Sequence, residues 1–261
     1  MSVLTPTKGP QRIYTVNPVA KIAAVLPLTI CLLLTLDWVS AATAVLGELA
    51  VFLGFGLRSR AVWLRTLPVW VGAPVAGASM VLYGAPSGTT YAHFGPVHVT
   101  SGSVEIGLAT AARLVAIALP AVVLFATIDP TDLADGLAQI ARLPSRFVLG
   151  ALAGLRLMGL LTADWRSLEL ARRARGVGDT DRLRRLLGQA MALLVLSVRR
   201  GSKLATAMEA RGFGGPTRRT WARPSSFGWR EWVTIALGVA LGAVAVGVAV
   251  VSGHWNLVLA S

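Results

Sequence analysis

Five long apolar runs alternate with polar or charged segments along the chain. They cover approximately residues 22–36, 39–57, 67–83, 104–128 and 229–251. Most of them approach the roughly 20 residues that a helix needs to cross the hydrocarbon core of a bilayer. The core of a soluble protein would not need so many apolar runs. The pattern therefore predicts an all-α, polytopic membrane protein with about five transmembrane helices.

The segment between the fourth and fifth runs, residues 129–217, has a different pattern. It predicts a short helix, then a long helix over residues 145–175 that ends at Gly176, and then a second long helix that follows Asp181 and ends at Gly212. Arginines interrupt the leucines of both long helices, and a charge at the centre of a bilayer is expensive. The pattern indicates amphipathic helices that lie along or beneath the membrane interface.

These patterns divide the chain into three parts. Residues 1–128 would hold transmembrane helices 1–4, residues 129–217 the long interfacial helices, and residues 218–261 the last transmembrane helix. Two glycine pairs have the small-xxx-small spacing that permits close helix crossing, and ordinary packing is a sufficient explanation of both. They are Gly150 with Gly154, and Gly238 with Gly242.

The formal net charge of +13 is concentrated in one region of the chain. Of 25 Lys and Arg residues, 17 lie between Arg142 and Arg223, whereas residues 67–112 contain none. By the positive-inside rule, this asymmetry predicts a cytoplasmic (inner) membrane protein whose N-terminus and residues 129–217 face the cytoplasm. Residues 84–103 are expected to form an outside loop. Nucleic-acid binding is disfavoured, because the basic region is apolar between its arginines.

Few residues show the pattern of a catalytic, cofactor or metal site. His93 and His98 lie in the predicted outside loop without a Cys or an acidic cluster nearby, so they are a weak candidate for metal ligands. Glu48 and Arg113 lie inside predicted spans, where ionisable residues invite a functional hypothesis. The preferred interpretation is structural, with Arg113 paired to Glu48 or Glu105. The sequence thus predicts no catalytic residue, no cofactor and no metal.

The tripeptide Ala-Arg-Gly occurs twice, each time at the predicted end of a long helix. An arginine in the last turn of a helix presents a planar fork of donors that can bind a carboxylate of a partner. A purely structural reading is also open, because arginine complements the helix dipole and glycine favours the position past the helix end. The two copies are Ala174-Arg175-Gly176 and Ala210-Arg211-Gly212.

Several segments resemble the transmembrane T component of energy-coupling factor (ECF) transporters. They are Asn17-Pro18-Val19-Ala20-Lys21, the stretch Thr131 to Leu137 with Leu143-Pro144, Glu169 to Gly176, and Met208-Glu209-Ala210-Arg211-Gly212-Phe213. The last of these is the most specific match. The resemblance implies two cytoplasmic ABC ATPase partners and one membrane S component, with Arg175 docked in one ATPase and Arg211 in the other. It also implies uptake of a vitamin, its precursor, or cobalt or nickel ions.

Two alternative functions fit the sequence less well. A membrane enzyme acting on a phosphorylated lipid would need a cluster of acids near the interface, and the sequence has only the scattered Asp129, Asp132 and Asp135. A secondary transporter would need two equivalent halves, which the lopsided charge opposes. A P-loop needs Gly-Lys-Ser/Thr, and none of Lys8, Lys21 and Lys203 follows a glycine. Energy for transport would have to come from a partner.

Overall fold

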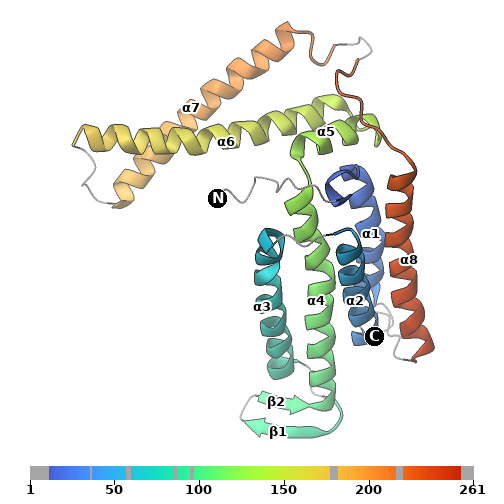
Figure 1. Ribbon diagram of the computed structural model, residues 1–261. Coiled ribbons are helices and arrows are strands. Elements are labelled where there is room, and N and C mark those ends of the chain that lie inside the picture. Colours follow the sequence, from blue (N-terminus) through green and yellow to red (C-terminus); the bar gives the residue numbers. More distant parts are fainter. Residues whose placement is uncertain are drawn as a thin grey trace. The chain divides into compact units, whose positions relative to one another are not determined.

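The computed structural model describes residues 12–35, 37–56, 60–84, 87–94, 97–176, 182–215 and 220–253. The chain forms two compact units, one of Met1–Leu133 with Ser225–Ser261 and the other of Ala134–Pro224. Helices account for nearly all of the regular structure described in both units (Figure 1). The predicted all-α class is confirmed.

The first unit is a bundle of helices that includes a short 3-10 turn. Asn17 begins α1, because its side chain accepts a hydrogen bond from the Val19 N–H and Pro18 supplies a fixed φ at the first helical position. Asp37 begins α2 and Thr100 begins α4 in the same manner. The elements are η1 (Arg12–Tyr14), α1 (Pro18–Leu34), α2 (Trp38–Gly54), α3 (Arg60–Tyr83), α4 (Ser101–Thr127) and α8 (Trp229–Val251).

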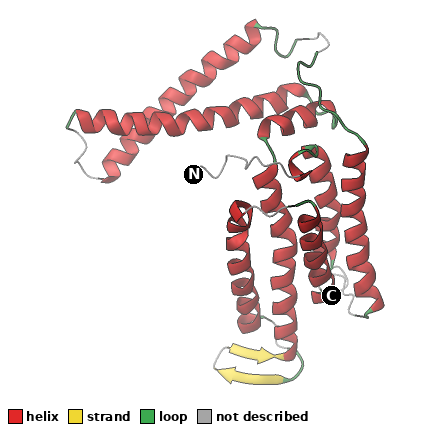
Figure 2. Ribbon diagram, viewed as in Figure 1, coloured by secondary structure: helices red, strands yellow, loops and turns green. Residues whose placement is uncertain are grey.

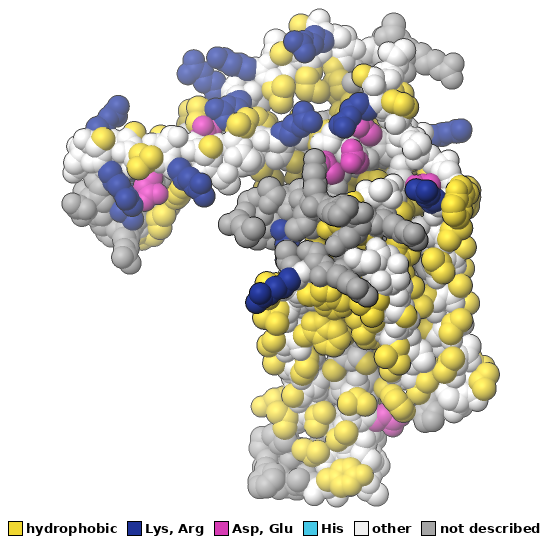
Figure 3. Space-filling view, viewed as in Figure 1, with side chains coloured by type: hydrophobic (Ala, Val, Ile, Leu, Met, Phe, Trp, Pro, Cys, Tyr) yellow, Lys and Arg dark blue, Asp and Glu magenta, His cyan; other side chains and the backbone are white. Residues whose placement is uncertain are grey.

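Small side chains fill the interior of this bundle. Helix α4 packs against α1, α2 and α3, and α8 packs against α1 and α2. Many of the buried positions are alanines, which let helix backbones approach closely, as is common between helices in a membrane. Large apolar side chains lie on the outside instead, and yellow apolar side chains are spread over the face of the bundle that is visible in Figure 3. This inside-out distribution fits a surface that contacts lipid.

The crossing of α1 and α8 depends on glycine. A Cβ atom added to Gly238 would lie 2.1 Å from the Ala24 carbonyl oxygen, and one added to Gly242 would lie 3.5 Å from Leu28 Cα. Gly238 therefore permits the close approach that the spacing predicts, whereas a Cβ at Gly242 would make an ordinary contact. The other pair differs, since no described atom lies within 4 Å of a Cβ position built on either Gly150 or Gly154.

Length and composition identify four candidate membrane spans among the described helices, namely α3 from Val62, α4, α6 (Ser145–Ala174) and α8. Helices α1 and α2 are apolar but have 17 residues each, about 26 Å. The candidate span in α6, with a mean hydropathy of 1.5, was not among the five predicted ones. Its charged residues are concentrated in its second half, so its first half has the composition of a span. The chain is a multi-pass helical membrane protein.

The segment expected to be an outside loop contains a β-hairpin. Strand β1 (Thr90–Phe94) pairs antiparallel with β2 (Val97–Thr100), as Figure 2 shows. The glycines, prolines and serines of residues 84–103 obscured a series of β-branched and aromatic residues with strong strand preference. His93 and His98 occupy paired positions in the hairpin, and their side chains lie outside the described ones.

The second unit contains two long helices that cross each other (Figure 1). They are α6 and α7 (Arg182–Ala210), and they are preceded by the short helix α5 (Pro130–Gln139), inside which the boundary between the units falls. Both long helices agree with the sequence prediction. Asp181, the residue expected to cap the second one, lies outside the described residues.

Candidate functional site

The first Ala-Arg-Gly sequence forms the C-terminal cap of α6. Ala174 is the last helical residue, and Arg175 is the cap residue with φ −89° and ψ 5°. The Gly176 N–H donates a hydrogen bond to the Arg173 carbonyl at 3.1 Å, and Gly176 has φ +68°. This left-handed conformation is costly for residues with a side chain. Glycine therefore ends the helix immediately after the arginine.

The second copy forms a matching cap on α7. The Gly212 N–H donates to the Glu209 carbonyl at 2.9 Å, and the Phe213 N–H donates to the Met208 carbonyl at 3.0 Å. These two bonds, with φ +76° at Gly212, are a Schellman motif. Arg211 thus occupies the same cap position on α7 as Arg175 does on α6. The sequence repeat is also a repeat of backbone geometry.

Both cap arginines extend into solvent. Arg175 and Arg211 are exposed, and neither guanidinium forms a hydrogen bond or an ion pair with any described residue. Other arginines of the unit are engaged, since Arg173 lies 2.6 Å from Glu169 on the same helix. The helix dipole alone places a cation at a helix end, but it does not keep the donors of the guanidinium free. Within the described part of the chain, the donors of the two cap arginines are unoccupied.

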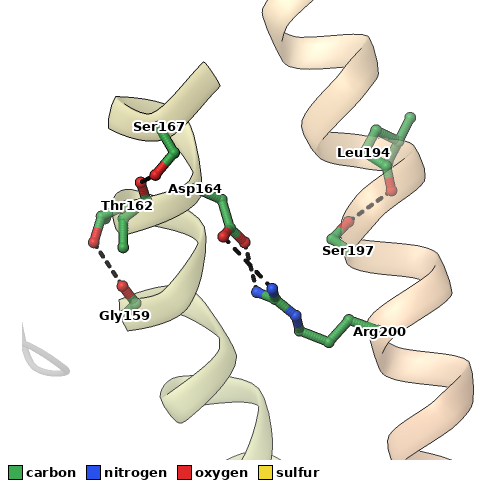
Figure 4. A network of polar contacts seen from close by, with 8 residues as sticks. Gly159, Thr162, Asp164, Ser167, Leu194, Ser197 and Arg200 are labelled. Atoms are coloured by element: carbon green, nitrogen blue, oxygen red, sulfur yellow. Dashed lines mark hydrogen bonds and ion pairs between the residues drawn. The ribbon is translucent and has the colours of Figure 1, made fainter. Parts of the chain in front are cut away.

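The crossing of α6 and α7 is held by charged side chains. Arg200 Nη1 of α7 donates to Asp164 Oδ2 of α6 at 2.5 Å, and Figure 4 shows the two side chains reaching toward each other. Nearer the end of α6, Arg172 Nη1 donates to the Arg185 carbonyl at 3.3 Å. These contacts fix how the two helices cross, and therefore how far apart the two Ala-Arg-Gly caps lie.

A groove of about 980 Å³ lies between α6 and the C-terminal half of α7. Its walls are largely apolar, with Leu152 of α6 and Met208 of α7 among the lining residues, and the cap residue Arg211 also lines it. In Figure 3 dark blue side chains mark the basic residues of this unit.

Sequence analysis did not predict the groove, because it depends on how the two helices cross. The leucines of α6 at helical spacing were its only signal.

The helices of the bundle carry ionisable side chains, among them Arg113, Glu48 and Lys21, and the structure corrects one expectation about them. Arg113 Nη2 donates to the Leu33 carbonyl at 2.7 Å, at the C-terminal end of α1, so the expected pairing of Arg113 with Glu48 or Glu105 is wrong. Glu48 is 3% exposed, and neither of its carboxylate oxygens has a partner among the described atoms. Lys21 is buried as well and donates to the Thr127 carbonyl at 3.3 Å.

The described part of the chain contains no group of three or more His, Cys, Asp or Glu residues arranged to hold a metal ion. The acidic residues of the second unit that do have partners form ion pairs, as Asp164 and Glu169 do. What the site offers is a pair of exposed cations at the ends of two crossing helices. Such an arrangement can bind acidic groups of a protein partner.

Comparison with known proteins gives a consistent set of relatives. Residues 10–221 match the family CbiQ, cobalt transport protein. The energy-coupling factor transporter transmembrane protein EcfT of Limosilactobacillus fermentum is 32% identical over 62% of this chain and 64% of its own length. The proteins of the same name from Bacillus selenitireducens and Brevibacillus brevis are 30% and 27% identical, over 62% and 72% of this chain and 62% and 73% of their own lengths.

The chain covers slightly less than two thirds of the length of the first two of these relatives. The family match is longer and includes both Ala-Arg-Gly helix ends as well as the first four helices of the bundle. These matches confirm the resemblance to the transmembrane component of ECF transporters, and the chain belongs to the CbiQ family of cobalt transport proteins.

Proposed function

We propose that this chain is the transmembrane coupling subunit of an ECF transporter. It links two cytoplasmic ABC ATPases to a membrane S component for ATP-driven uptake of a micronutrient, either a vitamin or a transition-metal ion. The observation that carries the proposal is the pair of helix caps, because Arg175 and Arg211 have the same backbone position and are both exposed and unpaired among the described residues. A subunit that contacts two similar partners needs two such equivalent contacts.

Each cap suits an acidic groove on an ATPase. A guanidinium group can form two parallel hydrogen bonds to one carboxylate, which fixes direction as well as distance. The residues on either side, Ala174 and Gly176 at one cap and Ala210 and Gly212 at the other, have small side chains that let a partner backbone approach. Because α6 and α7 are joined at their crossing, movement of one docked ATPase relative to the other would change the angle between the two helices.

The chain itself has no catalytic role in this proposal. ATP hydrolysis belongs to the partner subunits, since none of the lysines in the sequence stands in a P-loop pattern. No observation favours the alternative of an enzyme that acts on a phosphorylated lipid. The acidic residues Asp129 and Asp132 that such an enzyme would use lie at the start of α5, where Asp129 Oδ1 accepts a hydrogen bond from the Thr131 N–H.

The proposed location is the cytoplasmic membrane, with the N-terminus and residues 129–217 on the cytoplasmic side. The concentration of arginine in α6 and α7 supports this orientation, because positively charged segments are retained in the cytoplasm. Residues 129–217 would then act as the coupling domain between transmembrane parts 1–128 and 218–261. Helix α6 would lie at the interface, with Arg156 and Arg166 reaching water or lipid headgroups.

Purification of the tagged chain from its native membrane in mild detergent tests the proposal. Mass spectrometry should identify two ABC ATPase subunits, or two copies of one, and a small membrane protein that are absent from a parallel preparation of an untagged strain. The identity of the small membrane protein would then name the substrate class. A chain that purifies without any ATPase would contradict the proposed function.

A further inference from the structure

The N-cap residue of α1, Asn17, also holds the segment that leads into α8. Asn17 Nδ2 donates to Ser225 Oγ at 2.9 Å and to the Ser226 carbonyl at 3.0 Å, while Asn17 Oδ1 caps α1 itself. The Asn17 N–H donates to Glu231 Oε1 at 3.3 Å, and the other oxygen of Glu231 accepts from the Gly228 N–H at 2.8 Å. Asn17 thus ties the start of α1 to the start of α8.

Lys21, one turn further along α1, holds a different segment. Its Nζ atom donates to the carbonyl of Thr127, the last residue of α4, and Lys21 is only 5% exposed. A cation at this place interacts favourably with the negative end of the α4 dipole. Asp132 is also close enough for an electrostatic interaction with Lys21. The same turn of α1 is thus fixed to the segment where α4 ends and α5 begins.

These two segments have one property in common. The chain enters the unit Ala134–Pro224 after Leu133, within the helix that follows Thr127, and returns from it at Ser225. Within that unit, Gln139 Nε2 donates to the Arg223 carbonyl at 2.9 Å, so the outgoing and returning segments are also joined to each other. The two segments that connect the second unit to the bundle are therefore both hydrogen-bonded to the first turn of α1.

We propose that Asn17, Lys21 and Glu231, here called the α1 clamp, transmit movement of the second unit to the transmembrane bundle. This inference rests on the proposed function, because it concerns the movement that docked ATPases impose on α6 and α7. A connection transmits force only if it is stiff, and the α1 clamp removes the freedom of both connecting segments at the point where they join the bundle. Helix α1 packs against α8 and α4, which carries the movement further.

The three residues are positioning residues, since none of them belongs to the Ala-Arg-Gly caps. Sequence and spacing alone did not predict this role, because Asn17 and Ser225 lie 208 positions apart. The alternative is that the clamp only stabilises the fold. The two readings differ in one measurable respect: a clamp that only stabilises would not affect how a change in α6 and α7 reaches α1 and α8.

Hydrogen exchange of the purified complex, with and without a non-hydrolysable ATP analogue, separates these readings. Asn17→Ser keeps a side-chain oxygen that caps α1 but lacks the amide donor, and Lys21→Met keeps the apolar stem but lacks the ammonium group. In the wild-type complex the nucleotide should change amide exchange in α6 and α7 and in α1 and α8. In either variant the change in α6 and α7 should persist, while the change in α1 and α8 falls about fivefold or more.

Thr29→Val is the matched control, because among the described residues the Thr29 side chain bonds only within α1, to the Val25 carbonyl. It should behave as wild type, and Lys21→Arg should restore most of the transmitted change. Variants that keep the full change in α1 and α8 would overturn the α1 clamp. Loss of assembly in both Asn17→Ser and Lys21→Met, with Thr29→Val intact, would show a merely structural role. A wild-type complex without ATPases, or without nucleotide-dependent change in α6 and α7, would instead overturn the proposed function on which the inference rests.

Discussion

A chain that carries Arg175→Glu together with Arg211→Glu is expected to lose both ATPase partners while its helices remain folded. Each arginine is exposed and has no partner among the described residues, so its removal leaves no buried group unsatisfied in this chain. At the docking surface, however, each reversal would place two carboxylates together. Loss of one hydrogen-bonded charge at an interface typically costs about 2 to 5 kcal/mol. The two changes combined should reduce ATPase binding below detection in a detergent pull-down.

The control for this experiment has the same net charge and alters the same helices. Arg166 and Arg199 are exposed residues of α6 and α7 that lie outside the caps, and Arg166→Glu with Arg199→Glu changes the charge by the same amount. The control should retain its ATPases. Each single reversal at Arg175 or Arg211 should weaken binding without abolishing it. Equal loss of ATPases in the cap variant and in the control would show a general charge effect, and the docking role of the caps would be withdrawn.

Gly238→Val is expected to disrupt the crossing of α1 and α8. A Cβ atom at this position would lie 2.1 Å from the Ala24 carbonyl oxygen, a backbone atom that cannot move without the helix. The two helices must separate. Inserting a larger side chain into a packed site typically lowers stability by about 1 to 3 kcal/mol, and here the close contacts between small residues are lost as well. We expect a clearly lower melting temperature of the detergent-solubilised protein, measured by the unfolding of its helices.

Two other glycines of α8 form a graded control series. At Gly242 the nearest atom, Leu28 Cα, is 3.5 Å from the added Cβ, which is an ordinary contact, and at Gly247 no described atom lies within 4 Å. Alanine at Gly247 should therefore stabilise α8 slightly through its better helix propensity. The expected order of melting temperatures is Gly247→Ala above Gly242→Ala above Gly238→Ala. An equal effect at Gly247 and Gly238 would contradict the packing assigned to this crossing.

The helices that the sequence predicted well are those with a strong local signal. The fourth and fifth apolar runs match α4 and α8 closely, because a long apolar stretch with few charges has few other structures available in a membrane. The ends of α6 and α7 were predicted because Gly176 and Gly212 need a left-handed backbone. The β-hairpin was missed because glycines and prolines obscured its strand residues, and the apolar first half of α6 was not recognised as a candidate span.

The sequence predicted the cap arginines but not the contacts between segments that lie far apart in the chain. The cap arginines were found because the tripeptide that contains them is repeated. The contact of Arg113 with the Leu33 carbonyl, the bond between Asn17 and Ser225, and the groove beside Arg211 were not found. Each of these depends on which distant segments the fold brings together. The acceptors of Arg113 and Lys21 are backbone carbonyls at helix ends. Every residue has such a carbonyl, so the sequence does not indicate which one is used.

Site-specific photo-cross-linking tests the central claim most directly. A benzophenone amino acid at Ala174 or at Ala210, both exposed and next to the cap arginines, would be activated in native membranes, with Val239 on the exposed face of α8 as the control position. The account predicts cross-links to an ABC ATPase from positions 174 and 210, and none from position 239. Absence of an ATPase from the cross-links at both caps would contradict the docking of this chain through its two Ala-Arg-Gly helix ends.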